Sequence, residues 1–252
     1  YDDFDYFLFS ALMDTRDYLL AVLQDRSVPV RDRVAKLLVC THDFQLAVAK
    51  QELFSWETIR ARHECSGFSS AFLEKISDRC FLDVDRTDLM KQIWKTVVPK
   101  LEVLSPSWTG FLKQTLTDLY HACPEETSYR KLLLAFQETF PEWQVQKEQL
   151  MVYWLYTYFC GAVYDYEVES KLRFGIAAVL IIHEMDMAMW YKNKDLTFEE
   201  QVGLVHNYSM EIEHSDLNLD DMERMVMNSK AFGYRRLLTV LMNWKENSDE
   251  EK

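Results

Sequence analysis

Glycine and proline are scarce in this chain, with only six glycines and five prolines among 252 residues. Proteins built from many short strands need frequent turns, and turns draw heavily on these two residue types. The low count therefore argues against a sheet sandwich or barrel, and it favours long helices joined by few corners.

Cysteine is sparse too, and its spacing excludes the common cysteine-based sites. The number is odd and no two stand in a Cys-x-x-Cys arrangement; the cysteines are Cys40, Cys65, Cys80, Cys123 and Cys160. Neither a zinc site nor a disulfide framework is indicated. Reduced thiols in a cytoplasmic protein fit this pattern best.

Long apolar runs are missing as well. The longest run, Phe174–Ile182, is far shorter than the roughly 20 residues that a membrane-spanning helix needs, so no membrane partner is expected. No secretory signal precedes the first helical pattern, which begins at about Phe4. Because the sequence opens at Tyr1 without an initiator methionine, we expect the C-terminal module of a longer protein.

Positive charge is in deficit, with 28 Lys and Arg against 41 Asp and Glu and a net charge of −13. Such a surface repels phosphate backbones, so nucleic acid is a poor partner. A basic protein partner would be attracted. Solubility alone would also account for the acidity.

Helical periodicity, by contrast, covers nearly the whole chain. Helix starts are marked by Ser55, by Asp85 or Thr87, by Ser107 or Thr109, and by Thr127 or Ser128. Thr197 with Glu200 forms a capping box, and Asn218 with Asp221 can cap the helix that follows. The expected helices span about 4–24, 30–52, 55–77, 85–99, 107–124, 127–141, 142–164, 167–191, 198–213 and 232–244, with one more after 218.

These patterns predict an all-α fold, an irregular multi-helix bundle of about ten helices around a central Tyr-rich helix. We expect one helical domain over residues 1–252, in which the proline-marked corners at 99–106, 124 and 141 allow subdomains 1–123 and 124–252. The segment Cys80–Asp85 has the composition of a short strand, but it has no obvious partner.

The stretch Met151–Asp165 places six aromatic residues in little more than three helical turns. Aromatic residues then lie on every face, which predicts a helix buried on all sides. Since each buried phenol needs a hydrogen-bond partner, a polar network inside the core is expected there. That network would be either structural or the wall of a site.

Three histidine motifs suggest metals but are incomplete. His42-Asp43 is the dipeptide of HD-type phosphohydrolases, yet no earlier histidine is present, which favours an ordinary helix surface pair. His183-Glu184 lacks the second histidine of a zinc protease because Met187 stands at that position, so we expect a core histidine. Glu211 and His214 share one helix face and could bind one metal, but a di-iron bundle needs two such motifs.

The methionines and helix glycines favour packing roles. Two methionine clusters could line an adaptable groove, although core filling is the more common use. Single glycines within helices are expected to allow close helix packing. The residues concerned are Met185, Met187, Met189, Met222, Met225, Met227, Gly161, Gly175 and Gly203.

The run 151–182 resembles the C-terminal region of bacterial flagellin lysine-N-methylases, the FliB family. Members carry a Tyr-rich helix ending in an Ala-Val-Tyr-Asp corner, which corresponds to Ala162–Asp165 here, followed by a lysine that corresponds to Lys171. They also carry a Glu-His-Ser element, which corresponds to Glu213–Ser215, and an opening helix–turn–helix that resembles Asp14–Leu38.

The resemblance implies a protein lysine N-methyltransferase that transfers methyl groups from S-adenosylmethionine to flagellin lysines. It also implies an iron–sulfur cluster, held by a cysteine-rich segment that this chain does not contain, so the cluster is not expected to bind this chain alone. The residues of suitable type for catalysis are Tyr156, Tyr164, Asp165, Glu213 and His214.

Those residues also have structural explanations, since Asp165 with Lys171 could be an ion pair that pins the corner. Two further functions are therefore kept. One is a non-catalytic α-helical module that binds a protein or positions a substrate. The other is a metal-dependent hydrolase or oxidase that uses His183, Glu211 and His214.

Overall fold

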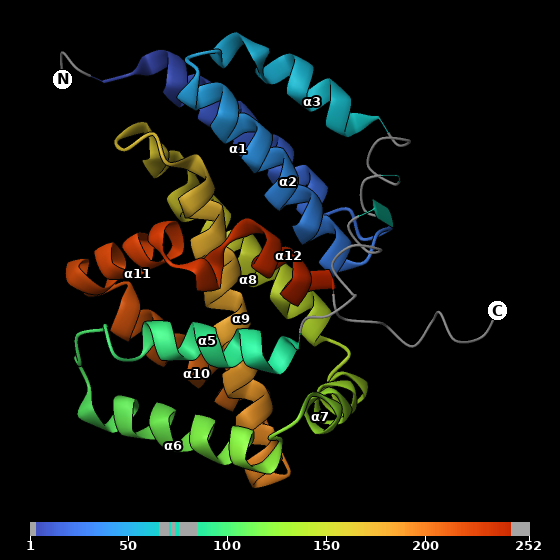
Figure 1. Ribbon diagram of the computed structural model, residues 1–252, viewed down its shortest axis with the longest axis vertical. Helices are drawn as coiled ribbons and strands as arrows, with labels where there is room; N and C mark the ends of the chain where they lie inside the picture. The colour runs from blue at the N-terminus through green and yellow to red at the C-terminus, as the bar shows by residue number, and fades with distance from the viewer. Residues whose placement is uncertain (1–3, 66–70, 72–73, 76–84, 243–252) are drawn as a thin grey trace. The chain divides into compact units, whose positions relative to one another are not determined.

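The computed structural model describes residues 4–65, 71, 74–75 and 85–242 (Figure 1). All regular structure in this described part is helical, which confirms the predicted all-α fold. The possible strand falls on residues 80–84, which lie outside the described residues. No helix among the described residues is both long enough and apolar enough to cross a membrane.

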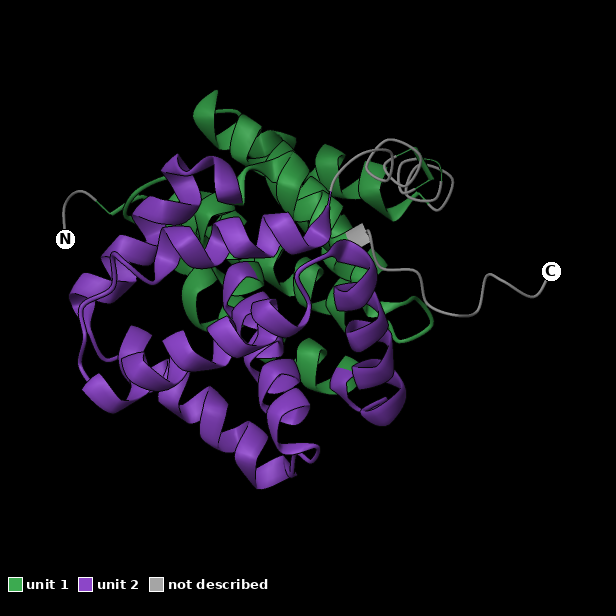
Figure 2. Cartoon of the chain, turned by 60° about the horizontal axis from the view of Figure 1, so that its bottom comes forward, with its two compact units in different colours: residues 1–84, 144–176, 232–252 green, residues 85–143, 177–231 purple. Residues whose placement is uncertain are grey.

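The chain forms two compact units, each made of non-contiguous segments (Figure 2). Unit 1 comprises residues 1–84, 144–176 and 232–252, and unit 2 comprises residues 85–143 and 177–231. These boundaries differ from the subdomains 1–123 and 124–252 that the prolines allow. The corner at Pro124 merely joins two helices of unit 2, whereas the chain changes units four times, after residues 84, 143, 176 and 231.

Unit 1 is built on three neighbouring helices at its N-terminal end, α1, α2 and α3, with α12 packed against α2. Its elements are α1 (Tyr6–Leu23), α2 (Val30–Ala49), η1 (Leu53–Ser55), α3 (Trp56–Glu64), α8 (Trp143–Tyr158, apart from its first residue), η2 (Phe159–Val163), the start of α9 (Val168–Asn193) and α12 (Tyr234–Met242).

Unit 2 contains the second part of α9, from Ala177 onward, and five further α-helices. Within this unit α5 packs against α7 and α11, and α10 packs against α11. The helices are α5 (Arg86–Val97), α6 (Pro106–Ala122), α7 (Glu126–Thr139), α10 (Phe198–Ile212) and α11 (Asp216–Asn228), and η3 (Lys230–Phe232) follows α11.

Side-chain caps begin several helices where the sequence predicts them. The capping box of Thr197 and Glu200 is present at α10, and Asp85 caps α5. The cap of α6 lies two residues before the predicted Ser107: Ser105 is the N-cap, and Pro106 is suited to the first helical position. The predicted Asn218 cap is wrong, since Ser215 caps α11 and the Asn218 amide is buried.

Glycine and methionine roles are confirmed in part. A Cβ on Gly175 would lie 2.9 Å from the Trp154 Cβ, so this glycine permits the close approach of α8 and α9. A Cβ on Gly203 would meet nothing within 4 Å, so the packing prediction is wrong there, and Gly161 makes only an ordinary contact. Four of the six clustered methionines are buried in the core; they are Met185, Met187, Met222 and Met225.

A buried carboxylate ties α8 to α2 and to the turn before α2. Glu148 is 1 % exposed and accepts hydrogen bonds from Arg26 at 2.8 Å and from Arg33 at 2.7 Å. Arg33 also donates to the backbone oxygen of Leu23. The hydrogen bonds from Arg26, together with those from Arg33, hold the pKa of Glu148 below its usual 4.5, although burial opposes them.

Replacement of this carboxylate should be costly. Glu148→Gln leaves Arg33 buried with no anionic partner, so we expect the free energy of unfolding at pH 7 to fall by about 3–5 kcal/mol. Because the folded-state pKa of Glu148 is depressed, the stability that its charged carboxylate contributes is fully present above the usual pKa of 4.5. This stability is lost as the pH falls through the depressed pKa.

The difference between wild type and Glu148→Gln, measured by urea unfolding, should therefore shrink as pH is lowered from 7 to about 3. Glu64→Gln is the matched control, because Glu64 forms an exposed i,i+4 pair with Arg60. Its cost should stay below about 1 kcal/mol. A Glu148→Gln cost as small as that of the control would contradict the assignment.

Candidate functional site

The Tyr-rich helix is not buried on all sides, contrary to the sequence-based expectation. Its core side is made by Trp154, Leu155 and Phe159, whereas Tyr156 is 63 % exposed and Tyr164 is 81 % exposed. Phenols tolerate this because the hydroxyl stays in water while the ring covers neighbouring apolar surface. The predicted burial is therefore wrong for Tyr156 and Tyr164, whose rings lie at the surface.

A buried phenol network is found instead in unit 2. Tyr120 donates to the Glu184 carboxylate at 2.8 Å, and Tyr129 donates to its other oxygen. Burial raises the pKa of Glu184, while the nearby charge of Arg86 and the two phenols oppose that shift. Glu184 is fully buried, and the two phenols satisfy its carboxylate oxygens inside the core.

The corner after η2 is held by the predicted ion pair. The Lys171 Nζ lies 2.6 Å from the Asp165 Oδ2, and Asp165 also accepts a hydrogen bond from the Glu167 amide at 2.9 Å. Gln45 of α2 clamps the other side: it donates to the Tyr166 carbonyl at 2.9 Å and accepts from the Glu169 amide at 3.0 Å. The corner backbone is thus fixed from both sides.

The other predicted residue of this region, Tyr156, lies under a cation. The Arg16 guanidinium is 4.9 Å from the centre of the Tyr156 ring, and its Nη1 is 3.9 Å from the Cys160 sulfur. Burial raises the pKa of the Cys160 thiol, with Arg16 opposing. Tyr156, Tyr164 and the corner all belong to unit 1.

Glu213 and His214 belong to unit 2, at the end of α10, where His214 is exposed. The carboxylate of the neighbouring Glu211 is bound by the backbone: it accepts hydrogen bonds from the amides of Leu104 at 3.1 Å and Ser105 at 2.7 Å. It therefore compensates the positive end of α6.

The remaining histidine motifs either lie in the core or bind carboxylates of the chain. His183 is a core histidine, 2 % exposed, as predicted. His42 contacts Glu169 and Asp43 contacts His63, so the two residues of the HD pair have different partners. The described cysteines are all free thiols, and no three His, Cys, Asp or Glu side chains among the described residues are grouped to hold a metal ion.

Beside the corner, unit 1 has a groove of about 1060 Å³ formed by the start of α1, the end of α2 and η1. Two of its aromatic side chains are strongly exposed, Phe54 at 92 % and Phe7 at 76 %. Carboxylates line it as well, and none of the described residues that line it is basic; the acidic members are Asp5, Asp14 and Glu57.

The backbone of this groove is strained at two points. Gln51 and Tyr166 both line it, and both adopt left-handed conformations, with φ of 60° and 62°. A non-glycine residue there costs on the order of 1 kcal/mol, and such residues concentrate at functional positions. The Tyr166 hydroxyl lies 3.4 Å from the Asp5 carboxylate. Sequence reasoning missed the groove, because its residues come from segments far apart in the chain.

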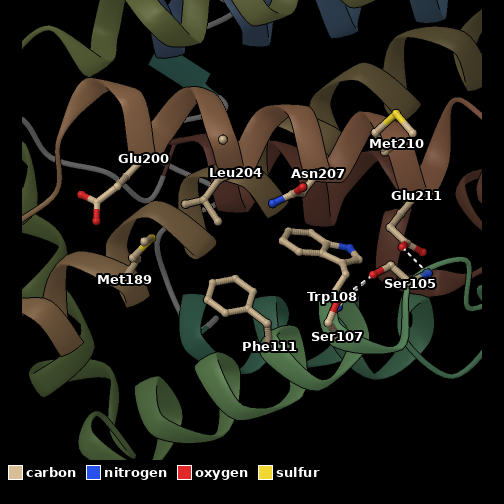
Figure 3. A pocket seen from close by; sticks show the side chains of 11 residues that line it. Ser105, Ser107, Trp108, Phe111, Met189, Glu200, Leu204, Asn207, Met210 and Glu211 are labelled. Carbon is tan, nitrogen blue, oxygen red and sulfur yellow. Dashed lines mark hydrogen bonds between the residues drawn. The ribbon is translucent and has the colours of Figure 1, made fainter.

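Unit 2 has a smaller pocket of about 420 Å³ between α6 and α10 (Figure 3). Trp108 and Phe111 project from α6 toward Leu204 and Asn207 of α10. Their rings are stacked with centroids 5.5 Å apart. Glu211 is part of this lining, although its carboxylate is engaged by the amides before α6.

A family comparison gives one match. The model of the FliB lysine N-methylase C-terminal domain matches residues 16–240, which is most of the chain. All of unit 2, most of unit 1, the corner and the pocket between α6 and α10 fall within this range, while part of the groove precedes it. No curated protein and no solved structure matches the chain.

The corner clamp makes a testable prediction. Gln45→Ala removes two hydrogen bonds, so the free energy of unfolding should fall by about 1–2 kcal/mol. The Glu169 amide loses its acceptor in the first turn of α9, so its hydrogen exchange should accelerate. Gln114→Ala, which removes one exposed pair within α6, is the control. Unchanged exchange at Glu169 in Gln45→Ala would refute the clamp.

Proposed function

Since this chain belongs to the family of FliB lysine N-methylase C-terminal domains, we propose that it is the helical module of a protein lysine N-methyltransferase acting on flagellin-type lysines. The observation that supports a substrate role most directly is the groove of unit 1. It combines exposed aromatic rings with carboxylates, and its described lining has no basic side chain.

That combination suits a lysine-bearing segment. The aliphatic stem of a lysine packs on aromatic faces, and its ammonium is attracted both by those faces and by carboxylates. Phe54 and Phe7 offer the faces, and Asp14 and Glu57 offer exposed negative charge. A chain with net charge −13 also attracts a basic partner over longer distances.

The proposed chemistry is transfer of a methyl group to the neutral amine of a lysine. S-adenosylmethionine, when bound, supplies a methyl group on a sulfonium. The residues of this chain hold the lysine and accept the proton that its ammonium must lose. We assign proton acceptance to the carboxylate of Asp165, which also pairs with Lys171, and we assign to the Tyr164 hydroxyl the relay of that proton: it takes one proton from the ammonium and passes its own to the carboxylate. Both residues precede the groove residue Tyr166.

The predicted catalytic roles of Tyr156, Glu213 and His214 stay predictions. The iron–sulfur cluster implied by the family does not fit the described residues, because no three potential ligands are grouped among them. No step is therefore assigned to it.

A non-catalytic module is the second candidate, and the same groove favours it. Strongly exposed aromatic side chains are typical of protein-binding surfaces, where they contribute much of the affinity. A module of this kind would bind the lysine-bearing segment without accepting a proton. Methyl transfer separates the two functions, since only the first requires it.

The groove is tested by binding of a lysine-containing flagellin peptide to the chain, followed by fluorescence anisotropy. Asp14→Asn with Glu57→Gln should weaken binding about tenfold, because two attractive charges are removed. Asp17→Asn with Glu64→Gln makes the same charge change on the same helices outside the groove, so affinity should change less than twofold. An equal loss of peptide affinity in both double variants would show that only the net charge matters, and it would overturn the proposal.

Phe54→Ser separates binding from folding. The side chain is 92 % exposed, so its removal should leave the free energy of unfolding within about 0.5 kcal/mol of wild type. Peptide affinity should nevertheless fall at least tenfold if the ring contacts the lysine stem. Wild-type affinity in this variant would exclude the groove as the binding site.

The proton relay is tested by Tyr164→Phe. The Tyr164 hydroxyl makes no hydrogen bond to the described residues, so helical content and stability should be unchanged. The methyl-transfer rate of the longer parent enzyme, measured by mass spectrometry on the same peptide, should fall at least tenfold, with an altered pH dependence. Tyr153→Phe on α8 is the control. A normal rate in Tyr164→Phe would remove this residue from the proposed chemistry.

A further inference from the structure

The pocket between α6 and α10 of unit 2 has features that neither the family match nor the groove explains. Its side chains form a band along one face of α10: Glu200, Gly203, Leu204, Asn207 and Glu211 follow a spacing of three or four residues. The volume of about 420 Å³ lies within the range of small-molecule sites.

The floor of the pocket is an aromatic platform. Trp108 is 7 % exposed and its ring stacks on Phe111, with an interplanar angle of 22°. In Figure 3 both rings face the side chains of Leu204 and Asn207 on the opposite helix. Such a slot accepts a flat ring, because planar heterocycles stack on aromatic side chains regardless of their detailed identity.

A specific polar group stands over that platform. The Asn207 amide makes no hydrogen bond to the described residues, and it points into the pocket beside the indole of Trp108 (Figure 3). An asparagine amide both donates and accepts, and it pairs in two places with the N6 and N7 edge of adenine. An adenine ring is therefore the best match to Trp108 and Asn207 together.

A carboxylate occupies the opposite end of the band. Glu200 lies seven residues before Asn207, which is about 10 Å along the helix axis. One of its oxygens accepts from Thr197 in the capping box, and the other makes no hydrogen bond to the described residues. In dinucleotide-binding folds a carboxylate binds the ribose hydroxyl, and the free oxygen of Glu200 can serve the same purpose here.

Charge selects among nucleosides. The lining contains two carboxylates, Glu200 and Glu211, and none of its described members is basic. A nucleoside phosphate would be repelled, whereas a neutral or cationic nucleoside would not.

The open position is Gly203, where a Cβ would meet nothing within 4 Å, so the space beside the platform is free because this residue has no side chain.

We propose that this pocket binds the adenosyl group of an unphosphorylated nucleoside, with adenine on Trp108 and Asn207 and the ribose toward Glu200. Under the function proposed above, on which this identification rests, the natural ligand is S-adenosylmethionine, whose sulfonium charge suits a pocket lined by carboxylates. The pocket itself follows from its own residues and would bind adenosine in the absence of any methyl transfer.

The test is isothermal titration of the chain with adenosine, S-adenosylmethionine and ATP in turn. Adenosine and S-adenosylmethionine should bind, and ATP should bind at least tenfold more weakly. Gly203→Leu fills the open space and should weaken adenosine and S-adenosylmethionine at least tenfold. Gly110→Leu is the matched control, since Gly110 lies exposed on α6 outside the pocket, and its affinities should stay within twofold of wild type.

Folding of Gly203→Leu is checked by circular dichroism, and leucine is the better helix former. Asn207→Leu, at an exposed position, gives a second and independent variant: it should lose the preference for adenosine over uridine. The proposal is overturned if no adenosyl compound binds, if ATP binds as tightly as adenosine, or if both variants bind like wild type.

The peptide assay for the groove distinguishes failure of this pocket from failure of the proposed function. Gly203→Leu should bind the flagellin peptide with wild-type affinity, because none of the groove residues is changed. Adenosine binding without peptide binding would support the pocket and remove the substrate groove. Peptide binding without binding of any adenosyl compound would support the substrate groove and overturn the proposal for the pocket.

Discussion

The interaction on which unit 1 depends is the buried carboxylate of Glu148 between Arg26 and Arg33. The same device recurs in unit 2. Glu211 holds the amides before α6, and Glu126 accepts hydrogen bonds from the amide and hydroxyl of Thr87 at 3.0 and 2.8 Å. Part of the acidity of this chain is therefore internal, because these glutamates bind arginine side chains and backbone amides within each unit.

Much of the fold could be predicted from the sequence, because its signals are local. Periodicity located the helices, the pair Thr197 and Glu200 located the start of α10, and the ion pair of Asp165 and Lys171 fixed the corner. Asn218 was misread because a cap and a buried amide have the same residue type. Which of them it is depends on Glu102 and Glu211, which lie elsewhere in the chain and whose backbone oxygens it binds.

The candidate sites were less predictable because they depend on contacts between segments that are distant in the sequence. Burial of the Tyr-rich helix was inferred from residue types, but tyrosine is stable at a surface as well as in a core, so Tyr156 and Tyr164 did not have to be enclosed. The groove brings the start of α1 near the end of α2, and the pocket brings α6 to α10. Neither arrangement has a fixed spacing in the sequence. Gly203 is visible in the sequence, but a glycine within a helix indicates close packing as readily as it indicates open space.

The left-handed residues Gln51 and Tyr166 set a limit on how far this protein can be made heat-resistant without losing its groove. Selection for thermal tolerance alone would drive both positions toward glycine, which adopts that conformation without steric penalty. Each such change would relax the backbone while erasing a side chain from the wall of the cavity. Thermostable relatives that keep bulky residues at these two positions would thus reveal a wall that is maintained for its use.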